Sequence, residues 1–224
     1  MTEQILEKSN IDELKKLMKP NIDERLPLAE RLKQPISYRY DWIISQINLL
    51  TKGRKLTILD VGSSNGLLSY LLLKEGHSLT AIDIDSEALL DLKDTYTSSL
   101  LPSKEDTTLN TNSDNRLIIL STDVLTTNPS PSFNVVVCSE VLEHLEDRKL
   151  LKVLKEYTIQ GGYIIITTPI ERNLYTKEHI NFYNLYTLID VIKELFTDFK
   201  ICKLHKFLKY QRPKNLFGIV IKVN

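Results

Sequence analysis

Short apolar runs alternate with longer amphipathic stretches over most of the chain. Runs rich in Val, Ile and Leu predict strands at 56–61, 78–83, 116–121, 133–138, 162–168, 198–206 and 216–223. Between them, leucines and other apolar residues at helical spacing predict helices at 65–75, 86–98, 146–158 and 184–196. Strands that alternate with helices in this way predict an α/β fold with a doubly wound sheet of seven strands.

The connections between strands predict how the strands run. The middle strands are nearly continuous in apolar residues, which is typical of parallel strands buried on both faces. The last two strands are joined by the short link 209–214 with no helix between them. We therefore expect a C-terminal hairpin that places one antiparallel strand in the sheet. The polar stretch 102–115 is rich in turn-forming residues and predicts a long surface loop.

The first fifty residues predict helices. The first helix ends at Pro20, and its apolar face is formed by Leu6, Ile11, Leu14 and Leu17. A second helix is expected at about 37–50, with an apolar face formed by Trp42, Ile43, Ile47 and Leu50. We expect the helical segment 1–52 to form a lid over residues 53–224, within one structural domain.

Composition narrows the class of protein. The chain has 224 residues, with 29 Lys plus Arg against 29 Asp plus Glu, so its overall charge favours neither nucleic acid nor an anionic membrane. The N-terminus is too polar for a signal peptide, and no apolar run approaches the roughly 18 residues that cross a bilayer. These features predict a soluble, cytoplasmic protein without a membrane partner. Cys138 lies in an apolar run and is expected to be a buried hydrophobic residue.

The segment 57–66 carries the most specific signal. It combines a buried strand, a tight turn between Gly62 and Gly66, and the start of a helix. The next predicted strand ends in Asp83. Such a turn lets a ligand approach the backbone and the helix N-terminus, and the acid can accept both hydroxyls of a ribose. This pairing predicts a nucleotide site.

Two residues indicate which nucleotide binds. Dinucleotide folds use G-x-G-x-x-G, in which the second glycine lets a pyrophosphate touch the backbone. Here that position holds Ser64, which would crowd a pyrophosphate. Asp60 adds a carboxylate that would repel phosphate but suits a cationic amino group or sulfonium. Both residues favour S-adenosylmethionine (SAM) over NAD or FAD.

The motifs ILDVGSSNG (58–66), LTAIDID (79–85), STDV (121–124), FNVVVCSEVLEHLED (133–147) and GGYIIITTP (161–169) follow one another in the chain. Through these motifs and their order, the chain resembles the class I SAM-dependent methyltransferases. Among them it resembles the small-molecule group that includes the ubiquinone-biosynthesis O-methyltransferases. The resemblance covers about residues 37–224. It implies a Rossmann-like fold with 53–224 as the SAM-binding domain. The usual turn G-C-G-T-G is replaced by GSSNG, which keeps both glycines.

The resemblance also implies which residues bind SAM. Asp83 would accept the ribose hydroxyls and Ile84 would pack on the adenine. Asp123 would receive the adenine amino group, with a backbone contact from Val124. The methionine end of SAM would lie against residues that precede Asp83 or follow Val124 in the chain. These residues are Arg39, Asp60, Gly62, Ser63, Ser64, Asn65, Gly66, Ser139 and Glu140.

His144, His179 and Glu140 are the candidate catalytic residues. Histidine can remove a hydroxyl proton near neutral pH, although His144 could instead make only a structural hydrogen bond. The set Glu140, Glu143, His144 and His179 also resembles a divalent-metal site of small-RNA 2′-O-methyltransferases. Because Glu-Val-Leu-Glu-His is common among relatives without metal, we expect no metal here.

The resemblance implies methyl transfer to an oxygen or nitrogen of a small metabolite by in-line displacement, with S-adenosylhomocysteine as product. An RNA methyltransferase is a second possibility, because seven Lys or Arg and no acid follow residue 199. Exposed lysines that protect a sheet edge explain the same pattern. A non-catalytic SAM-binding module and a nicotinamide dehydrogenase are also compatible with the glycine turn and Asp83. The acceptor and the oligomeric state are not predicted by the sequence.

Overall fold

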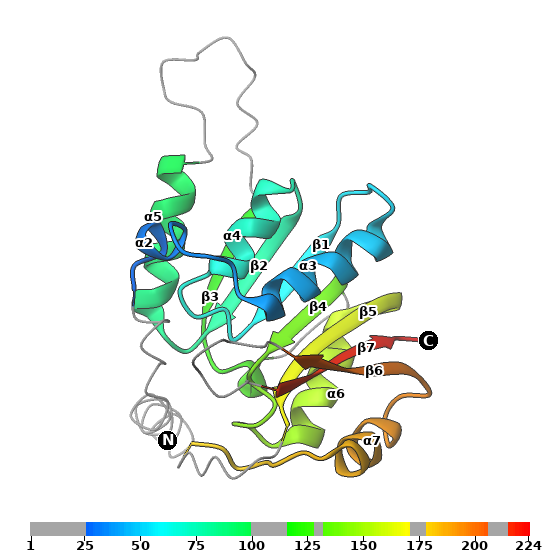
Figure 1. The fold of residues 1–224 in the computed structure, drawn as a ribbon. Coiled ribbons are helices and arrows are strands. Elements are labelled where there is room, and N and C mark those ends of the chain that lie inside the picture. Colours follow the sequence, from blue (N-terminus) through cyan, green and yellow to red (C-terminus); the bar gives the residue numbers. More distant parts are fainter. Residues whose placement is uncertain (1–25, 100–115, 128–131, 171–177, 206–214) are drawn as a thin grey trace, which may run out of the picture.

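The computed structural model describes residues 26–99, 116–127, 132–170, 178–205 and 215–224. They form one sheet in the order β3-β2-β1-β4-β5-β7-β6 (Figure 1). The strands are β1 (Thr57–Val61), β2 (Ser78–Asp83), β3 (Leu117–Ser121), β4 (Phe133–Ser139), β5 (Thr158–Pro169), β6 (Asp198–His205) and β7 (Asn215–Lys222). β7 runs antiparallel to both β5 and β6, and the other neighbouring pairs are parallel. The predicted α/β fold and its antiparallel strand are confirmed; the predicted hairpin link lies outside the described residues.

Helices cover both faces of the sheet (Figure 1). They are α2 (Leu28–Arg31), α3 (Tyr38–Thr51), α4 (Leu67–Lys74), α5 (Ser86–Ser99), the 3₁₀ helix η2 (Val124–Thr126), α6 (Asp147–Tyr157) and α7 (Leu185–Lys193). Successive residues of β1 show the two layers: Ile58 packs with residues of α3 and α4, whereas Leu59 packs with residues of α6 and α7. This follows from the alternation of side chains along a strand.

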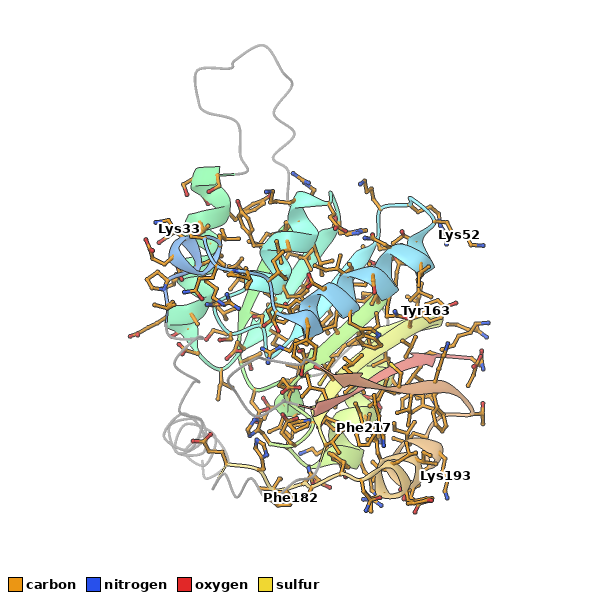
Figure 2. The ribbon with its side chains drawn as sticks, viewed as in Figure 1. Lys33, Lys52, Tyr163, Phe182, Lys193 and Phe217 are labelled. Atoms are coloured by element: carbon orange, nitrogen blue, oxygen red, sulfur yellow. The ribbon has the colours of Figure 1, made fainter. Side chains whose placement is uncertain are left out.

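The interior is filled from both sides (Figure 2). Phe217 of β7 is fully buried against the α6 and α7 layer, whereas Phe182, on the segment before α7, lies at the surface. Cys138 is fully buried, as predicted. None of the described helices has the length and apolar character that a membrane crossing requires.

β3 departs from the predicted burial of the middle strands on both faces. Its Ile118 and Leu120 are 52% and 38% exposed, although Leu117 and Ile119 of the same strand pack against the α5 layer. The described part of the connection from β3 to β4 contains only the three-residue η2. No described helix therefore covers the second face of β3, and the prediction was wrong for this edge strand.

Some predicted boundaries were also wrong. β5 begins at Thr158, directly after α6, rather than at 162, because Thr158 pairs with Phe133 of β4, Gly161 N–H donates to Val223 O, and Val223 N–H donates to Gly162 O. This pairing with the end of the chain extends the strand through glycines that locally favour a turn. α2 and η2 were missed because three or four residues show no periodicity. The first predicted helix and the predicted loop 102–115 lie outside the described residues.

Candidate functional site

The turn after β1 requires glycine for two reasons. Gly62 and Gly66 both have left-handed backbones, with φ of 69° and 73°. A Cβ on Gly62 would lie 2.3 Å from Val141 Cγ2, and one on Gly66 would lie 2.6 Å from Leu92 Cδ2. Gly62 N–H also donates to Ile82 O at 2.9 Å. The turn is therefore packed tightly against the start of the loop after β4 and against α5.

Asp83 connects the end of β2 to this turn. Its Oδ2 accepts a hydrogen bond from Ser64 N–H at 2.7 Å, and its Oδ1 accepts one from Asp85 N–H at 2.9 Å. A carboxylate has about four acceptor positions, so positions remain for two hydroxyls of a ligand. Burial raises the pKa of Asp83 above its usual value, against the opposing effect of these hydrogen bonds. Because Ser64 N–H is bonded to Asp83, this donor is already occupied and does not face a pyrophosphate.

Asp60 lies in the interior at the end of β1. Its carboxylate is buried and accepts a hydrogen bond from Ser69 Oγ on α4 at 2.7 Å. Burial raises the pKa of Asp60 to about 7, and the neighbouring Asp83 adds to the shift. The sequence indicated an acid near the turn but gave no signal for its Ser69 partner.

A pocket opens at the carboxyl ends of β1 to β4, where ligands bind in open α/β sheets. It contains five of the predicted cofactor residues, namely Gly62, Asp83, Ile84, Asp123 and Val124. Asp123 Oδ1 accepts a hydrogen bond from Leu125 N–H at 2.8 Å, which caps η2. The remaining lining residues were not predicted, because their types carry no chemical signal; they are Val61, Ile82, Thr122, Val141 and Leu145.

Predicted residues that are distant in sequence meet at the end of β4. Ser139 Oγ lies 2.9 Å from Thr167 Oγ1 of β5. Glu140 has a left-handed backbone, with φ of 58°, and its Oε2 lies 3.9 Å from Arg39 Nη1. The Arg39 guanidinium also lies over the Tyr40 ring, 4.7 Å from its centroid. The start of α3 is thus placed beside the loop after β4.

Glu143, His144 and His179 form a second cluster. Their nearest ligand atoms all lie within 4.8 Å of one another, and Glu140 is not part of this group. Glu143 is buried, accepts a hydrogen bond from Thr168 Oγ1 at 3.2 Å, and has a pKa held well above its usual value by burial and by Glu140. The two imidazole rings meet edge to face, with centroids 4.8 Å apart. Burial, and then the neighbouring His144, lower the pKa of His179.

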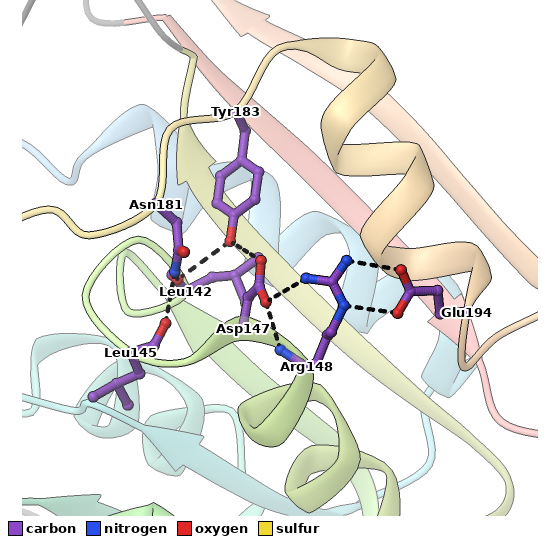
Figure 3. Close-up of polar contacts among 7 residues, drawn as sticks. All are labelled: Leu142, Leu145, Asp147, Arg148, Asn181, Tyr183 and Glu194. Atoms are coloured by element: carbon purple, nitrogen blue, oxygen red, sulfur yellow. Dashed lines mark hydrogen bonds and ion pairs between the residues drawn. The ribbon is translucent and has the colours of Figure 1, made fainter.

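The segment 178–184, which carries His179, is hydrogen-bonded to the loop before α6 through Asn181 and Tyr183 (Figure 3). Asn181 Nδ2 donates to the carbonyl oxygens of Leu142 and Leu145, and Tyr183 OH donates to Asp147 Oδ2 at 3.1 Å. Sequence reasoning missed these contacts. No residue pattern could have indicated them, because two of the acceptors are main-chain carbonyls.

The residues before α3 contact the glycine turn. Asn65 Nδ2 donates to Leu26 O at 3.1 Å, and Leu28 N–H donates to Asp91 Oδ2 of α5 at 2.6 Å. Residues 26–32 therefore lie against α5 and against the turn that holds the pocket.

This geometry can be compared with known proteins. A family model described as a methyltransferase domain matches residues 12–203. The chain belongs to this methyltransferase family. A nicotinamide dehydrogenase is thereby excluded, and the predicted methyltransferase activity and SAM cofactor are confirmed.

Curated relatives of this methyltransferase include two ubiquinone biosynthesis O-methyltransferases. The one from Rickettsia typhi is 27% identical over 83% of this chain and 67% of its own length. The one from Coxiella burnetii is 30% identical over the same shares. The chain thus spans about two thirds of the length of these relatives. The N-methyltransferase NodS from Bradyrhizobium japonicum, in complex with S-adenosylhomocysteine, is 16% identical, covers 95% of this chain and 97% of its own, and has a TM-score of 0.64. This likeness shows the fold alone.

The residues in and next to the methyltransferase pocket fit SAM. Ser63 Oγ is buried and has no hydrogen-bond partner among the residues that the structure describes. A buried hydroxyl normally has a partner, so this atom suits a polar group of a ligand. The acceptor positions left on Asp83 suit a ribose. Gly62 and Val141 both line the pocket, and a side chain at position 62 would displace Val141.

Proposed function

We propose that this methyltransferase transfers the methyl group of SAM to a hydroxyl oxygen of a small molecule. The observation that carries the proposal is the imidazole of His144, which directly precedes the pocket-lining Leu145 and has its Nδ1 bonded to a backbone carbonyl. A hydroxyl becomes a good nucleophile only as it loses its proton, so an oxygen acceptor needs a base of this kind. The curated names of the two relatives, both O-methyltransferases, support the proposal.

The donor side of the reaction is assigned to residues around the pocket. Asp83 accepts the ribose hydroxyls, Asp123 receives the adenine amino group, and Ile84 packs on the adenine. Val124 supplies a backbone contact. When bound, SAM supplies an activated methyl group on a positively charged sulfur.

The methionine end is assigned to the turn 62–66, Asp60 and Ser139. Arg39 pairs with the methionine carboxylate; its position 3.9 Å from Glu140, a predicted residue of the methionine end, supports this assignment. Glu140 then faces the acceptor. The segment before residue 53 acts as a lid, which excludes water from the reacting atoms; its contacts with Asn65 and Asp91 support this role.

On the acceptor side, His144 is the general base and His179 its neighbour. In the neutral imidazole of His144 the Nδ1–H is bonded to Glu178 O, so Nε2 is free to take a proton. The lowered pKa of His179 keeps that ring neutral at pH 7, so it does not repel a proton arriving at His144.

Two alternatives to this proposal must be tested: a metal-dependent methyl transfer, and methylation of RNA instead of a small molecule. The Glu143, His144 and His179 cluster could hold a divalent ion, which would require ionisation of the Glu143 carboxyl. An RNA acceptor would use the basic C-terminal region. Of its residues, Lys200 and Lys203 are exposed on β6, which forms one edge of the sheet. Exposed lysines on an edge strand prevent pairing with other chains, and this role explains both residues.

The experiment is mass spectrometry after incubation of the protein with methyl-labelled SAM, once with a metabolite extract and once with RNA. We expect the label on an oxygen of a small molecule. Label found only on nitrogen or only in RNA would overturn the proposal.

Two further measurements test the base. His144→Gln should lower kcat by about 10²- to 10⁴-fold, the usual contribution of a general base, while the Kd for SAM stays unchanged in calorimetry. Treatment with a chelator should leave activity unchanged. Loss of activity on chelation, restored by a divalent ion, would replace the base with a metal site.

A further inference from the structure

The segment 178–184 is bonded to the peptide groups on both sides of His144. The backbone N–H groups of Ile180 and Asn181 both donate to Glu143 O, at 2.9 and 3.1 Å. The two chain segments are far apart in sequence, and a short stretch after β5 thus lies along the loop after β4. His144 and His179 face each other across this contact.

The side chain of Asn181 completes this attachment (Figure 3). Its Nδ2 donates to Leu142 O at 2.9 Å and to Leu145 O at 2.6 Å. One amide nitrogen with two N–H groups is needed for this bridge, and asparagine supplies it on a short side chain. Because Leu142 and Leu145 flank residues 143 and 144, the bridge fixes the backbone at both ends of the pair.

The same attachment brings a carbonyl to the His144 ring. His144 Nδ1 lies 3.0 Å from Glu178 O. A carbonyl oxygen only accepts hydrogen bonds, so Nδ1 carries the proton, and in the neutral ring Nε2 is unprotonated. His144 Nε2 lies 4.0 Å from Glu143 Oε1, within the cluster that Glu143, His144 and His179 form.

We propose that Asn181 is a positioning residue that selects the Nδ1–H tautomer of His144 by holding Glu178 O against that nitrogen. The inference rests on the proposed function, in which His144 Nε2 accepts the proton of the acceptor hydroxyl. Asn181 contacts the pocket-lining Leu145 only at its backbone carbonyl, and it acts on His144 through the position of the backbone. A base held in the wrong tautomer loses most of its catalytic effect.

The test compares substitutions at Asn181 with a change elsewhere in the same attachment. Asn181→Ala removes both side-chain N–H donors, whereas Asn181→Ser replaces them with a single O–H donor; the backbone N–H that donates to Glu143 O remains in both variants. Tyr183→Phe is the matched control, because it removes the contacts of Tyr183 OH with Asp147 Oδ2 at 3.1 Å and with Leu142 O at 3.5 Å but retains both Asn181 Nδ2 donors. The chain has four histidines, so their ring nitrogens are few enough to resolve by ¹⁵N NMR. The His144 signals are assigned by their loss in His144→Gln.

In the wild type and in Tyr183→Phe we expect His144 with a protonated Nδ1 and an unprotonated Nε2. In Asn181→Ala we expect a shift towards the Nε2–H tautomer, together with a fall in kcat of about 10- to 100-fold, a part of the whole contribution of a base. The KM for SAM should stay within about twofold. Asn181→Ser should give intermediate values of both the tautomer ratio and kcat.

A protonated Nε2 in the wild type would overturn the inference, as would an unchanged tautomer in a folded Asn181→Ala variant. Should Asn181→Ala fail to fold, Asn181→Ser decides by the same readouts. The tautomer measurement needs no turnover, so it is independent of the proposed function. If the tautomer responds as expected while His144→Gln retains full methyl transfer, the base assignment fails and the positioning role of Asn181 stands.

Discussion

The two halves of the site are held in different ways. The donor half, formed by the turn 62–66, Asp83 and Asp123, is organised by side-chain carboxylates that bind backbone N–H groups, as in the bond from Ser64 N–H to Asp83 Oδ2. The acceptor half, formed by residues 140–145 and 178–184, is organised by N–H groups that bind backbone carbonyls, as in the bonds from Asn181 to Leu142 and Leu145.

The difference determines what a substitution can change. In the donor half the residue types are imposed by backbone conformation and by the need for a carboxylate, so few replacements are tolerated. In the acceptor half most acceptors are peptide carbonyls, which every residue has. The donor half should therefore show large effects from single changes, and the acceptor half should show smaller ones that depend on position.

The largest effect is expected for Gly62→Ala. A left-handed backbone with a Cβ costs about 1–2 kcal/mol, and the overlap with Val141 Cγ2 adds about 1–3 kcal/mol of overpacking. Gly53→Ala is the control, because Gly53 also has positive φ but no atom within 4 Å of its Cβ position. Urea unfolding should show a loss of about 2–5 kcal/mol for Gly62→Ala against about 1–2 kcal/mol for Gly53→Ala. Equal losses would show that the turn is not packed tightly against Val141.

A large effect on binding is expected for Asp83→Ala. Hydrogen bonds to a charged group contribute about 1.5–3 kcal/mol each, so losing two should weaken SAM binding by about 100-fold or more. Asp83→Asn keeps one acceptor oxygen and should lose about tenfold. Asp85→Ala is the control, since Asp85 Oδ1 only caps the start of α5. Calorimetry that finds unchanged SAM affinity in Asp83→Ala would remove the ribose assignment.

A moderate, pH-dependent effect is expected for Asp60→Asn. The folded pKa of Asp60 is about 7, above the usual value near 4. Between these values the native state binds a proton that the unfolded state has lost, so stability falls as pH rises, by up to about 1.4 kcal/mol per pH unit. Asp60→Asn lacks this contribution. The stability difference between wild type and variant, measured by urea unfolding from pH 4 to 8, should therefore decline with rising pH; a flat difference would contradict the buried carboxyl.

The smallest effect is expected for a surface ion pair next to the acceptor half. Arg148 makes two bonds to the Glu194 carboxylate, from Nε at 2.7 Å and from Nη2 at 2.8 Å, joining α6 to α7 (Figure 3). Both side chains are exposed, so water and salt screen the pair. A double-mutant cycle on melting temperature should find weak coupling that disappears at high salt. Strong coupling would mean that this surface pair, rather than Asn181, sets the position of the acceptor half.

The same contrast separates what could be predicted from what could not. The chain from 57 to 66 and Asp83 could be assigned because a left-handed turn demands glycine and a ribose demands a carboxylate. Arg39 and Glu140 were candidates, but their approach to 3.9 Å depends on how α3 packs on the sheet. The roles of Asn181 and Ser69 left no signal, because an asparagine or a serine near a helix is equally common at the surface.

The sequence by itself determined the α/β alternation, the antiparallel last strand, the glycine turn and the acid after β2. These depend on local conformation and on the period of apolar residues, which neighbouring residues fix. Only the tertiary structure decided that β3 keeps one exposed apolar face, that Gly161 and Gly162 join a strand through Val223, and that Asn181 bridges the peptide groups around His144. The reason is that these contacts use main-chain partners, which every residue has, and that the exposure of β3 depends on which described helices pack against it; no residue type signals either.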